Sequence, residues 1–286
     1  MKFFFVQFSV LFFISISSLS TNAQPTMLVA GDSWAWLPCL MGSFQTAFLH
    51  EKIHANVAAC TKTSGMHIRA ENWLDRKEHN QMMKMLSSRK DITVVYLSLG
   101  GNDFLTHWRV DMTSEQEANL INDIRDKVEK IVATITTARP DVKVLVSGYD
   151  FSRIYSEHKN ISNYDKMYER SGRPSISQMH HSFDHFTKAM SKIGDGNQVA
   201  FIHHVGLMQY HFGNSETGLS PHLTLPPEQI SPPNAPDMTG GDPDKELDKK
   251  AMARIGKIVD SYHLTPKGYV LLVRHSIQHY LRDWLK

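Results

Sequence analysis

Three residues of this chain are of the types that together can turn a serine hydroxyl into a nucleophile: Ser33, Asp260 and His263. A serine becomes reactive when a base takes its proton, and the base must itself be oriented by another group. Asp260 and His263 are three residues apart, so on a turn one imidazole nitrogen can meet the carboxylate while the other faces Ser33. A capping aspartate beside a surface histidine has the same spacing, and the chain contains 16 histidines.

Ser33 directly follows a short apolar segment, residues 27–31, that ends at Gly31. The segment predicts a buried strand with the serine at its carboxyl edge. Ligands bind at this edge of open α/β sheets because the loops form a crevice and the next helix presents unpaired N–H groups. Gly-Asp-Ser also fits an ordinary helix N-cap, so the segment by itself does not establish a reactive serine.

Acyl transfer also needs hydrogen-bond donors for the developing oxyanion, and losing one donor costs about 2.7–4 kcal/mol of barrier. Asn102 follows the clearest buried strand, residues 91–99, and offers a side-chain amide. Gly65 follows another short strand and offers a backbone N–H with no Cβ in the way. With the N–H of Ser33, these residues predict three donors at one edge of one sheet.

The elements that must position these residues alternate between strands and helices. Buried strands are expected at residues 27–31, 55–59, 91–99, 142–146 and 199–205. Helices are expected at residues 36–49, with Pro38 in the first turn, and at 67–86, 114–139, 176–190, 244–259 and 266–286, the last capped by Thr265. This alternation predicts an α/β fold with a mostly parallel sheet that is covered on both faces.

The N-terminus has the pattern of a secretory signal peptide, residues 1–23, with cleavage after Ala23. The alternative is a retained membrane anchor, although the apolar run is short for a bilayer span of about 20 residues. No later stretch is long and apolar enough to span a membrane. We therefore expect a secreted or periplasmic protein whose mature part is one domain, residues 24–286.

The charge balance and the middle of the chain narrow the function classes. The chain has 31 Lys and Arg against 29 Asp and Glu without a long basic run, so binding to nucleic acid or anionic lipid is not indicated. Regularity is lost over residues 149–250, which we interpret as an insertion. Its proline- and glycine-rich part, residues 213–244, is either a flexible wall or lid beside the site or a disordered loop.

Two cysteines and several aromatic residues carry weaker indications. Cys39 and Cys60 could form a disulfide in an exported protein or remain free thiols, and their spacing is not a zinc pattern. The adjacent pairs His180-His181 and His203-His204 suggest a metal, but neighbouring side chains diverge, so core or surface positions are expected. Trp34 and Trp108, close in sequence to Ser33 and Asn102, are candidates for lining a substrate site.

Taken in order, these segments resemble the four signature blocks of the SGNH or GDSL hydrolases. The blocks are Gly31-Asp32-Ser33, Gly65, Gly100-Gly101-Asn102-Asp103, and Asp260-x-x-His263, with Leu264-Thr265-Pro266 continuing the last one. The resemblance covers about residues 27–148 and 258–286, and its second block consists of a single glycine. The chain lacks G-x-S-x-G, the pattern of the α/β-hydrolases.

The resemblance implies a three-layer α/β/α sandwich with a flavodoxin-like parallel sheet. It implies that Ser33 is the nucleophile, His263 the general base and then acid, and Asp260 the orienting carboxylate. The N–H groups of Ser33 and Gly65 and the amide of Asn102 would form the oxyanion hole. No metal and no cofactor would be needed.

The implied activity is hydrolysis of an O-acyl ester of a carbohydrate, a lipid or another small molecule through an acyl-enzyme. Transfer of the acyl group to a sugar hydroxyl would use the same triad, provided that the site excludes water. A non-catalytic binding module that retains the fold is the alternative outside enzymes. The intact set of Ser33, Asp260 and His263 argues against a binding module, because a protein that only binds does not need all three residues.

Overall fold

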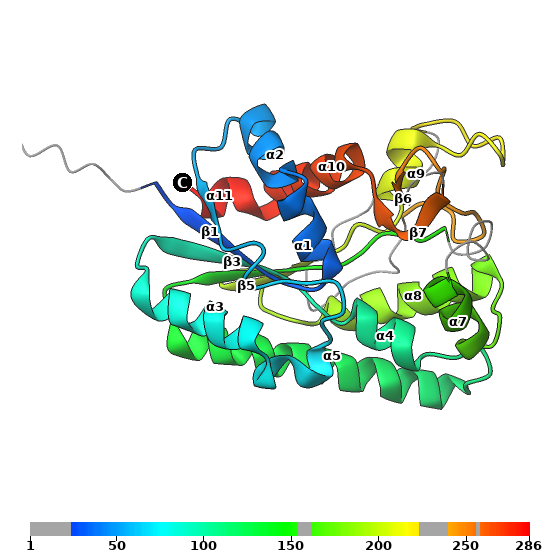
Figure 1. The fold of residues 1–286 in the computed structure, drawn as a ribbon, viewed down its shortest axis with the longest axis horizontal. Coiled ribbons are helices and arrows are strands. Elements are labelled where there is room, and N and C mark those ends of the chain that lie inside the picture. The colour runs from blue at the N-terminus through cyan, green and yellow to red at the C-terminus, as the bar shows by residue number, and fades with distance from the viewer. Residues whose placement is uncertain (1–23, 154–161, 223–239, 256–257) are drawn as a thin grey trace, which may run out of the picture.

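The computed structural model describes residues 24–153, 162–222, 240–255 and 258–286 of the chain (Figure 1). The predicted signal peptide and residues 223–239 of the predicted loop lie outside the described residues, so the predictions for them are untested. The division of the chain into a signal peptide and one domain with an insertion also stays a prediction.

A sheet of five parallel strands forms the centre of the fold, in the order β2-β1-β3-β4-β5. This is the flavodoxin-like order, in which the chain reverses direction across the sheet between β1 and β3. The strands are β1 Thr26–Gly31, β2 Asn56–Ala58, β3 Ile92–Ser98, β4 Lys143–Ser147 and β5 Val199–Ile202. All side chains of β1 are buried, as expected for a parallel sheet covered on both faces.

Helices cover both faces of the sheet, and the predicted three-layer α/β/α fold is confirmed (Figure 1). One layer contains α1 Ser33–Leu40, α2 Ser43–Glu51, α10 Pro266–Ser276, the π-helical turn η3 Ile277–Leu281 and α11 Arg282–Trp284. The opposite layer contains α3 Lys77–Ser88, α4 Gly101–His107, α5 Ser114–Ala138 and α8 Ile176–Met190. The helix α7 Ser162–Arg170 and the short α9 Leu207–Phe212 lie at the end of the molecule where the strands of the sheet finish.

The most periodic helices form as predicted. Helix α5 begins after Thr113 and α8 begins after Ser175, and each of these N-cap residues forms a capping box with a glutamine three residues later. Helix α10 begins with Pro266 after Thr265, whose hydroxyl accepts a hydrogen bond from the N–H of Gly268. Local capping and a continuous apolar face are sufficient to define these three helices.

The helix expected at residues 36–49 is instead two helices. Helix α1 begins already at Ser33, because the carboxylate of Asp32 caps it by accepting a hydrogen bond from the N–H of Trp34. The sequence predicted Pro38 in the first turn of the helix, but it lies inside the helix. Gly42, with a left-handed φ of 67°, separates α1 from α2.

The helix expected at residues 67–86 is also divided. A 3₁₀ helix, η1 Ala70–Asp75, precedes α3, and Arg76 between them is extended. The carboxylate of Asp103 accepts hydrogen bonds from the N–H groups of Ala70 and Glu71, at 2.7 and 2.9 Å. A contact from a distant loop thus fixes where this turn begins, which the local pattern could not indicate.

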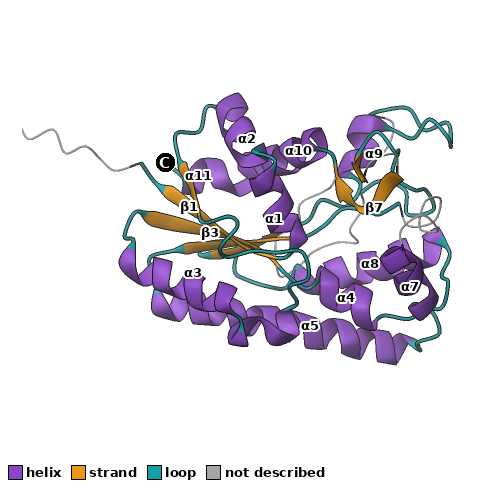
Figure 2. Ribbon diagram, viewed as in Figure 1, coloured by secondary structure: helices purple, strands orange, loops and turns teal. Residues whose placement is uncertain are grey.

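The prediction of a helix at residues 244–259 is wrong. Strands β6 Met252–Ile255 and β7 Ile258–Leu264 form an antiparallel pair there, separate from the main sheet (Figure 2). Met252 pairs with Leu264 and Arg254 pairs with Val259, so residues 260–263 lie opposite the single residue Ala253. Strand β7 therefore bulges over residues 260–263, which gives them the turn-like geometry expected for this segment.

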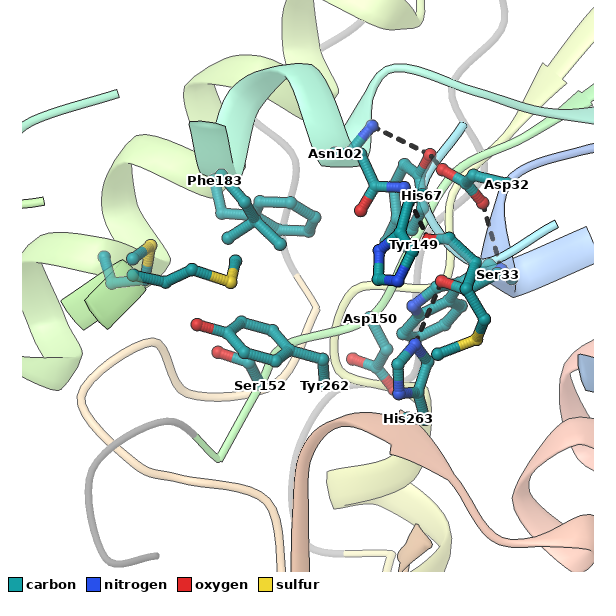
Figure 3. Close-up of a pocket in the computed structure, with 16 residues that line it drawn as sticks. Asp32, Ser33, His67, Asn102, Tyr149, Asp150, Ser152, Phe183, Tyr262 and His263 are labelled. Atoms are coloured by element: carbon teal, nitrogen blue, oxygen red, sulfur yellow. Dashed lines mark hydrogen bonds between the residues drawn. The ribbon is translucent and has the colours of Figure 1, made fainter. Parts of the chain in front are cut away.

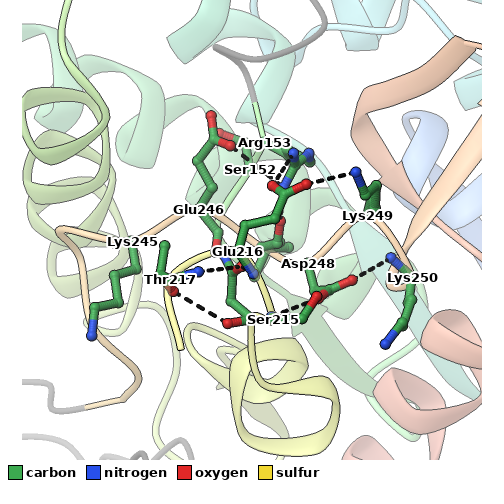
Figure 4. A network of polar contacts seen from close by, with 12 residues as sticks. Ser152, Arg153, Ser215, Glu216, Thr217, Lys245, Glu246, Asp248, Lys249 and Lys250 are labelled. Carbon is green, nitrogen blue, oxygen red and sulfur yellow. Dashed lines mark hydrogen bonds and ion pairs between the residues drawn. The ribbon is translucent and has the colours of Figure 1, made fainter. Parts of the chain in front are cut away.

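Tertiary contacts explain why residues 244–251 are not helical. The carboxylate of Asp248 accepts hydrogen bonds from the N–H and the hydroxyl of Ser215, both at 2.9 Å. The buried guanidinium of Arg153 donates to Glu216 at 2.6 Å and to the carbonyl of Leu247 at 2.8 Å (Figure 4). These contacts hold the segment in an irregular conformation and outweigh its intrinsic helix propensity.

Cys39 and Cys60 are joined in a disulfide, with their Cα atoms 5.5 Å apart. The bridge connects α1 to the loop that follows β2, so the structure decides between the two states that the sequence left open. Among the described residues, no helix is both long enough and apolar enough to cross a membrane.

Candidate functional site

The serine lies where β1 turns abruptly into α1. Gly31 ends the strand with a φ of 128°, and a Cβ on it would lie 1.9 Å from the carbonyl oxygen of Ser98. Only glycine fits this close approach of two parallel strands. The turn places Ser33 as the first residue of α1, at the carboxyl edge of the sheet as expected.

Ser33, His263 and Asp260 form a continuous hydrogen-bonded chain (Figure 3). The Nε2 atom of His263 is 2.9 Å from the hydroxyl oxygen of Ser33, and its Nδ1 atom is 2.8 Å from Oδ2 of Asp260. All three residues are buried. The other carboxylate oxygen of Asp260 accepts hydrogen bonds from the N–H groups of Tyr262 and His263, at 2.8 and 3.1 Å, which fixes the carboxylate within the bulge of β7.

This arrangement can transfer a proton. With Nδ1 donating to the carboxylate, Nε2 of His263 is left as the acceptor for the hydroxyl proton of Ser33. Asp260 fixes the tautomer and would stabilise the imidazolium that forms. A hydroxyl, an imidazole and a carboxylate in this order meet the geometric requirement for covalent catalysis by serine.

Asn102 lies in the first turn of α4, close to the serine, but its amide group is already hydrogen-bonded. Its Nδ2 atom donates to the carbonyls of Met66 and Ile68, at 3.1 and 2.9 Å. The amide therefore holds the loop after β2 against the loop after β3. Its predicted role as an oxyanion donor requires that it release one of these carbonyls.

The expectation for Gly65 needs correction. Its N–H donates to the carbonyl of Gly31 at 3.0 Å, as part of a parallel bridge between Gly31 and Ser64 that extends the pairing along β1. A donor engaged in the sheet is not available to an oxyanion. Ser33 is the first residue of α1, and no hydrogen bond of its N–H to another described residue is found.

Tyr149, which the sequence analysis missed, connects the two loops of the site. Its hydroxyl donates to Oδ2 of Asp32 at 2.5 Å and accepts a hydrogen bond from the N–H of Gly101 at 2.8 Å. Burial raises the pKa of Asp32 to about 7, and burial also raises the pKa of Tyr149. Tyr149 follows β4 by two residues, so its place at the carboxyl edge of the sheet was a usable signal.

Asp150, the next residue, was also missed. One of its carboxylate oxygens accepts hydrogen bonds from the N–H groups of Phe151 and Gly206, and the other accepts from Met208, all at 2.7 Å. Burial raises the pKa of Asp150 to about 7. The residue anchors the start of α9 beside the site.

A cavity of about 340 Å³ opens beside the serine. Residues from both ends of the chain and from the predicted insertion line it: Asp32, Ser33, Trp34, Met66, His67, Gly101, Asn102, Leu105, Tyr149, Asp150, Ser152, Met167, Met179, Phe183, Tyr262 and His263. Trp34 is among them, as predicted. Asp260 is behind His263 and does not line the cavity.

Trp108 does not line the cavity, contrary to the expectation. Its ring stacks on Phe104 with centroids 5.6 Å apart, and it is buried in the core at the end of α4. Proximity to Asn102 in the sequence was misleading because the helix turns this side chain away from the site.

The histidine pairs are not arranged as a metal site. His204 is buried, with Nε2 3.1 Å from the hydroxyl of Ser147 and Nδ1 3.0 Å from Nδ1 of His275. Across the described ranges, no group of three or more His, Cys, Asp or Glu residues could hold a metal ion. Burial lowers the pKa of both His204 and His275 well below the usual value.

These lowered pKa values predict a loss of stability in acid. The unfolded chain takes up protons on His275 below a pH of about 6.5, whereas the folded chain does not, so stability falls as the pH falls. For one such histidine the loss between pH 7 and pH 5 is about 2 kcal/mol. We expect His275→Gln to lose less stability over this interval than the wild type, by about that amount, in urea unfolding at both pH values. The control is His50→Gln, which changes an exposed histidine. Equal losses of stability in the wild type and in His275→Gln would contradict the prediction.

Comparisons with known proteins support the fold. No family model matches the chain, and no curated protein matches it. A solved structure described as a putative platelet activating factor from Streptococcus pneumonia has a TM-score of 0.50 at 14% identity, covering 94% of this chain and 87% of that chain. A lipase from a goat rumen metagenome has a TM-score of 0.50 at 10% identity, covering 91% of this chain and 97% of that chain. At such identities, the likeness shows a shared fold alone.

Proposed function

We propose that this protein is an exported serine esterase of the SGNH type, which hydrolyses an O-acyl ester through an acyl-enzyme. The observation that carries the proposal is the chain of contacts from the hydroxyl of Ser33 through the imidazole of His263 to the carboxylate of Asp260. The cavity beside Ser33 provides room for a substrate. The signature segments of the sequence, found in the family's order, are the second support.

The proposed reaction uses these three residues in turn. The hydroxyl of Ser33 attacks the ester carbonyl while Nε2 of His263 takes its proton, and Asp260 stabilises the imidazolium. His263 then returns the proton to the leaving alcohol, which yields an acyl group on Ser33. A water molecule then attacks this acyl group while His263 takes its proton, and His263 passes that proton to the oxygen of Ser33 as the carboxylic acid leaves.

The N–H of Ser33 and the amide of Asn102 are the proposed oxyanion donors. Ser33 N–H stands at the start of a helix, where a backbone donor has no intrahelical partner. Asn102 serves in this role when the oxyanion replaces the carbonyl of Met66 or Ile68 as acceptor, because an oxyanion is the stronger acceptor. Gly65 is left out because its N–H bonds to Gly31.

Asn102→Ala is expected to lower kcat by a factor of about 10² to 10³, because the transition state loses one donor. The measurement is the hydrolysis rate of p-nitrophenyl butyrate, with thermal unfolding recorded to detect any loosening of the loop that Asn102 holds. Asn122→Ala on α5, away from the cavity, is the matched control. A wild-type kcat in Asn102→Ala would exclude the side chain from the oxyanion hole.

The export part of the proposal rests on the signal-peptide pattern of residues 1–23. The disulfide between Cys39 and Cys60 adds support, because such bridges persist in oxidising compartments outside the cytosol.

The test of the proposed function is labelling of the folded protein with a fluorophosphonate, which reacts with activated serines. We expect an adduct on the peptide that contains Ser33, and none in Ser33→Ala. An adduct without turnover of any ester in water would favour acyl transfer to another hydroxyl. No adduct on folded protein would contradict the proposal and favour a binding module.

A further inference from the structure

We propose that the cavity beside Ser33 binds an apolar acyl chain of medium length. The preferred substrates are then medium-chain acyl esters, and not acetates or esters that place a sugar in the cavity. This inference rests on the proposed function. It names the substrate class of the same site and is argued from the walls of the cavity.

Side chains without charge form much of the cavity wall. Leu105 comes from α4, Met167 from α7, Met179 and Phe183 from α8, and Tyr262 from β7. Figure 3 shows Phe183 and Tyr262 facing each other across the space that extends from Ser33. Burying an apolar chain between such walls is favourable, by about 0.8 kcal/mol for each CH₂ group.

The two carboxylates and the amide in the cavity wall are already hydrogen-bonded within the protein; His67, Ser152 and Tyr262 are the other polar residues that the wall contains besides Ser33, His263, Trp34 and Tyr149. The carboxylate of Asp32 accepts from Trp34 N–H and from the Tyr149 hydroxyl. Asp150 accepts from three backbone N–H groups, and the amide of Asn102 donates to two carbonyls. A sugar ring in this space would find neither the carboxylates nor the amide available to its hydroxyls, and desolvating each hydroxyl left without a partner would be costly.

The position of the cavity wall relative to His263 and Asn102 indicates that the cavity holds the acyl side of the ester. The leaving oxygen must face His263, because His263 returns the proton to it. Phe183 lies beside Asn102 and across the cavity from His263, and Leu105 is on the same helix as Asn102 (Figure 3). The wall formed by Phe183 and Leu105 is thus on the side of Asn102, and we assign to it the acyl chain that remains on Ser33.

Methionine side chains make the cavity wall adaptable. Met66, Met167 and Met179 contribute three unbranched, flexible walls, which suit chains of varied length better than a single rigid shape. Two of them, Met167 and Met179, belong to residues 149–250, the region that resembles no signature block. The insertion therefore supplies the specificity while the two ends of the chain supply the chemistry.

The experiment compares p-nitrophenyl esters of acetate, butyrate, hexanoate, octanoate and decanoate, which share one leaving group. We expect kcat/KM to rise about fourfold for each added CH₂, the equivalent of about 0.8 kcal/mol, until the chain outgrows the cavity. A second series keeps acetate and lengthens the alcohol, and we expect no comparable rise in it. A flat or falling acyl series, or a rise only in the alcohol series, would overturn the inference.

A bulky residue in the apolar wall of the cavity tests whether the cavity binds the acyl chain. We expect Met167→Trp to reduce the ratio of kcat/KM for hexanoate to that for acetate by at least tenfold. Met83→Trp is the matched control, since Met83 is a half-buried methionine on α3 outside the cavity, and it should leave the ratio unchanged. Equal ratios in both variants and in the wild type, from folded proteins, would contradict the inference.

Fluorophosphonate labelling separates the two proposals. An adduct on Ser33 together with a flat acyl series leaves the esterase standing and removes the chain-binding cavity. Absence of an adduct on folded protein removes the esterase itself, and with it the basis of this inference.

Discussion

Ser33→Ala is expected to lower the hydrolysis of p-nitrophenyl butyrate by about 10⁶-fold, the scale of the loss when a serine nucleophile is removed. The hydroxyl is the atom that bonds to the acyl group, and neither His263 nor Asp260 can replace it. The substitution should leave the fold intact, because the only hydrogen bond found for the hydroxyl within the described residues is the one to His263. The measurement is the initial rate with the variant at high concentration, corrected for spontaneous hydrolysis.

Ser43→Ala provides the matched control for this loss. Ser43 is also a buried serine that begins a helix, α2, but it does not line the cavity. We expect its specific activity to equal that of the wild type. Unchanged activity in Ser33→Ala would refute the proposed nucleophile, and an equal loss in Ser43→Ala would show that packing and not chemistry was measured.

Asp260→Asn is expected to lower kcat by about 10⁴-fold, the effect of presenting the histidine in the wrong tautomer. In the native site one carboxylate oxygen accepts from the backbone N–H groups of Tyr262 and His263, so an asparagine would keep its oxygen there. Its NH₂ group would then point at Nδ1 of His263, and the ring proton would move to Nε2. A protonated Nε2 cannot accept the proton of Ser33.

The control for this prediction is Asp195→Asn. The carboxylate of Asp195 also accepts hydrogen bonds from backbone N–H groups, those of Asn197, Gln198 and Val199, in a loop outside the cavity. It should retain wild-type kcat. We also expect the double variant Ser33→Ala/Asp260→Asn to be no slower than Ser33→Ala alone, since residues that act as a unit are not additive. Additive losses, or full activity in Asp260→Asn, would contradict the assigned role.

The fold was predictable where the signal is local and repeated. The apolar stripe of α5 and the capping residue Thr113 define a helix without help from other segments. The run that forms β3 is rich in β-branched residues and ends before Gly100, and this pattern was sufficient to predict a strand. The helix prediction for residues 244–259 failed because the polar residues of this segment have helix propensity. Their actual partners, such as Ser215 and Arg153, lie elsewhere in the chain.

The candidate site was predictable in its chemistry and less so in its contacts. Ser33 and His263 are 230 residues apart, yet both could be named because each residue type has a defined role and each segment has a recognisable pattern. The structure brings them within hydrogen-bond distance, and their catalytic roles stay predictions. The expected contributions of Gly65 and Trp108 failed, since the N–H of one bonds to the sheet and the ring of the other packs in the core.

The sequence by itself determined the alternation of the five strands of the main sheet with helices, the end of β1 at a glycine, and the types and spacing of Ser33, Asp260 and His263. These properties depend on residue type and short-range spacing. Only the tertiary structure decided that Tyr149 joins the loops of Asp32 and Gly101, that Cys39 bonds to Cys60, and that methionines from the insertion line the same cavity as the serine. The reason is physical: a donor or an aromatic ring does not choose its partner locally, and the packing of distant segments determines which partner comes within reach.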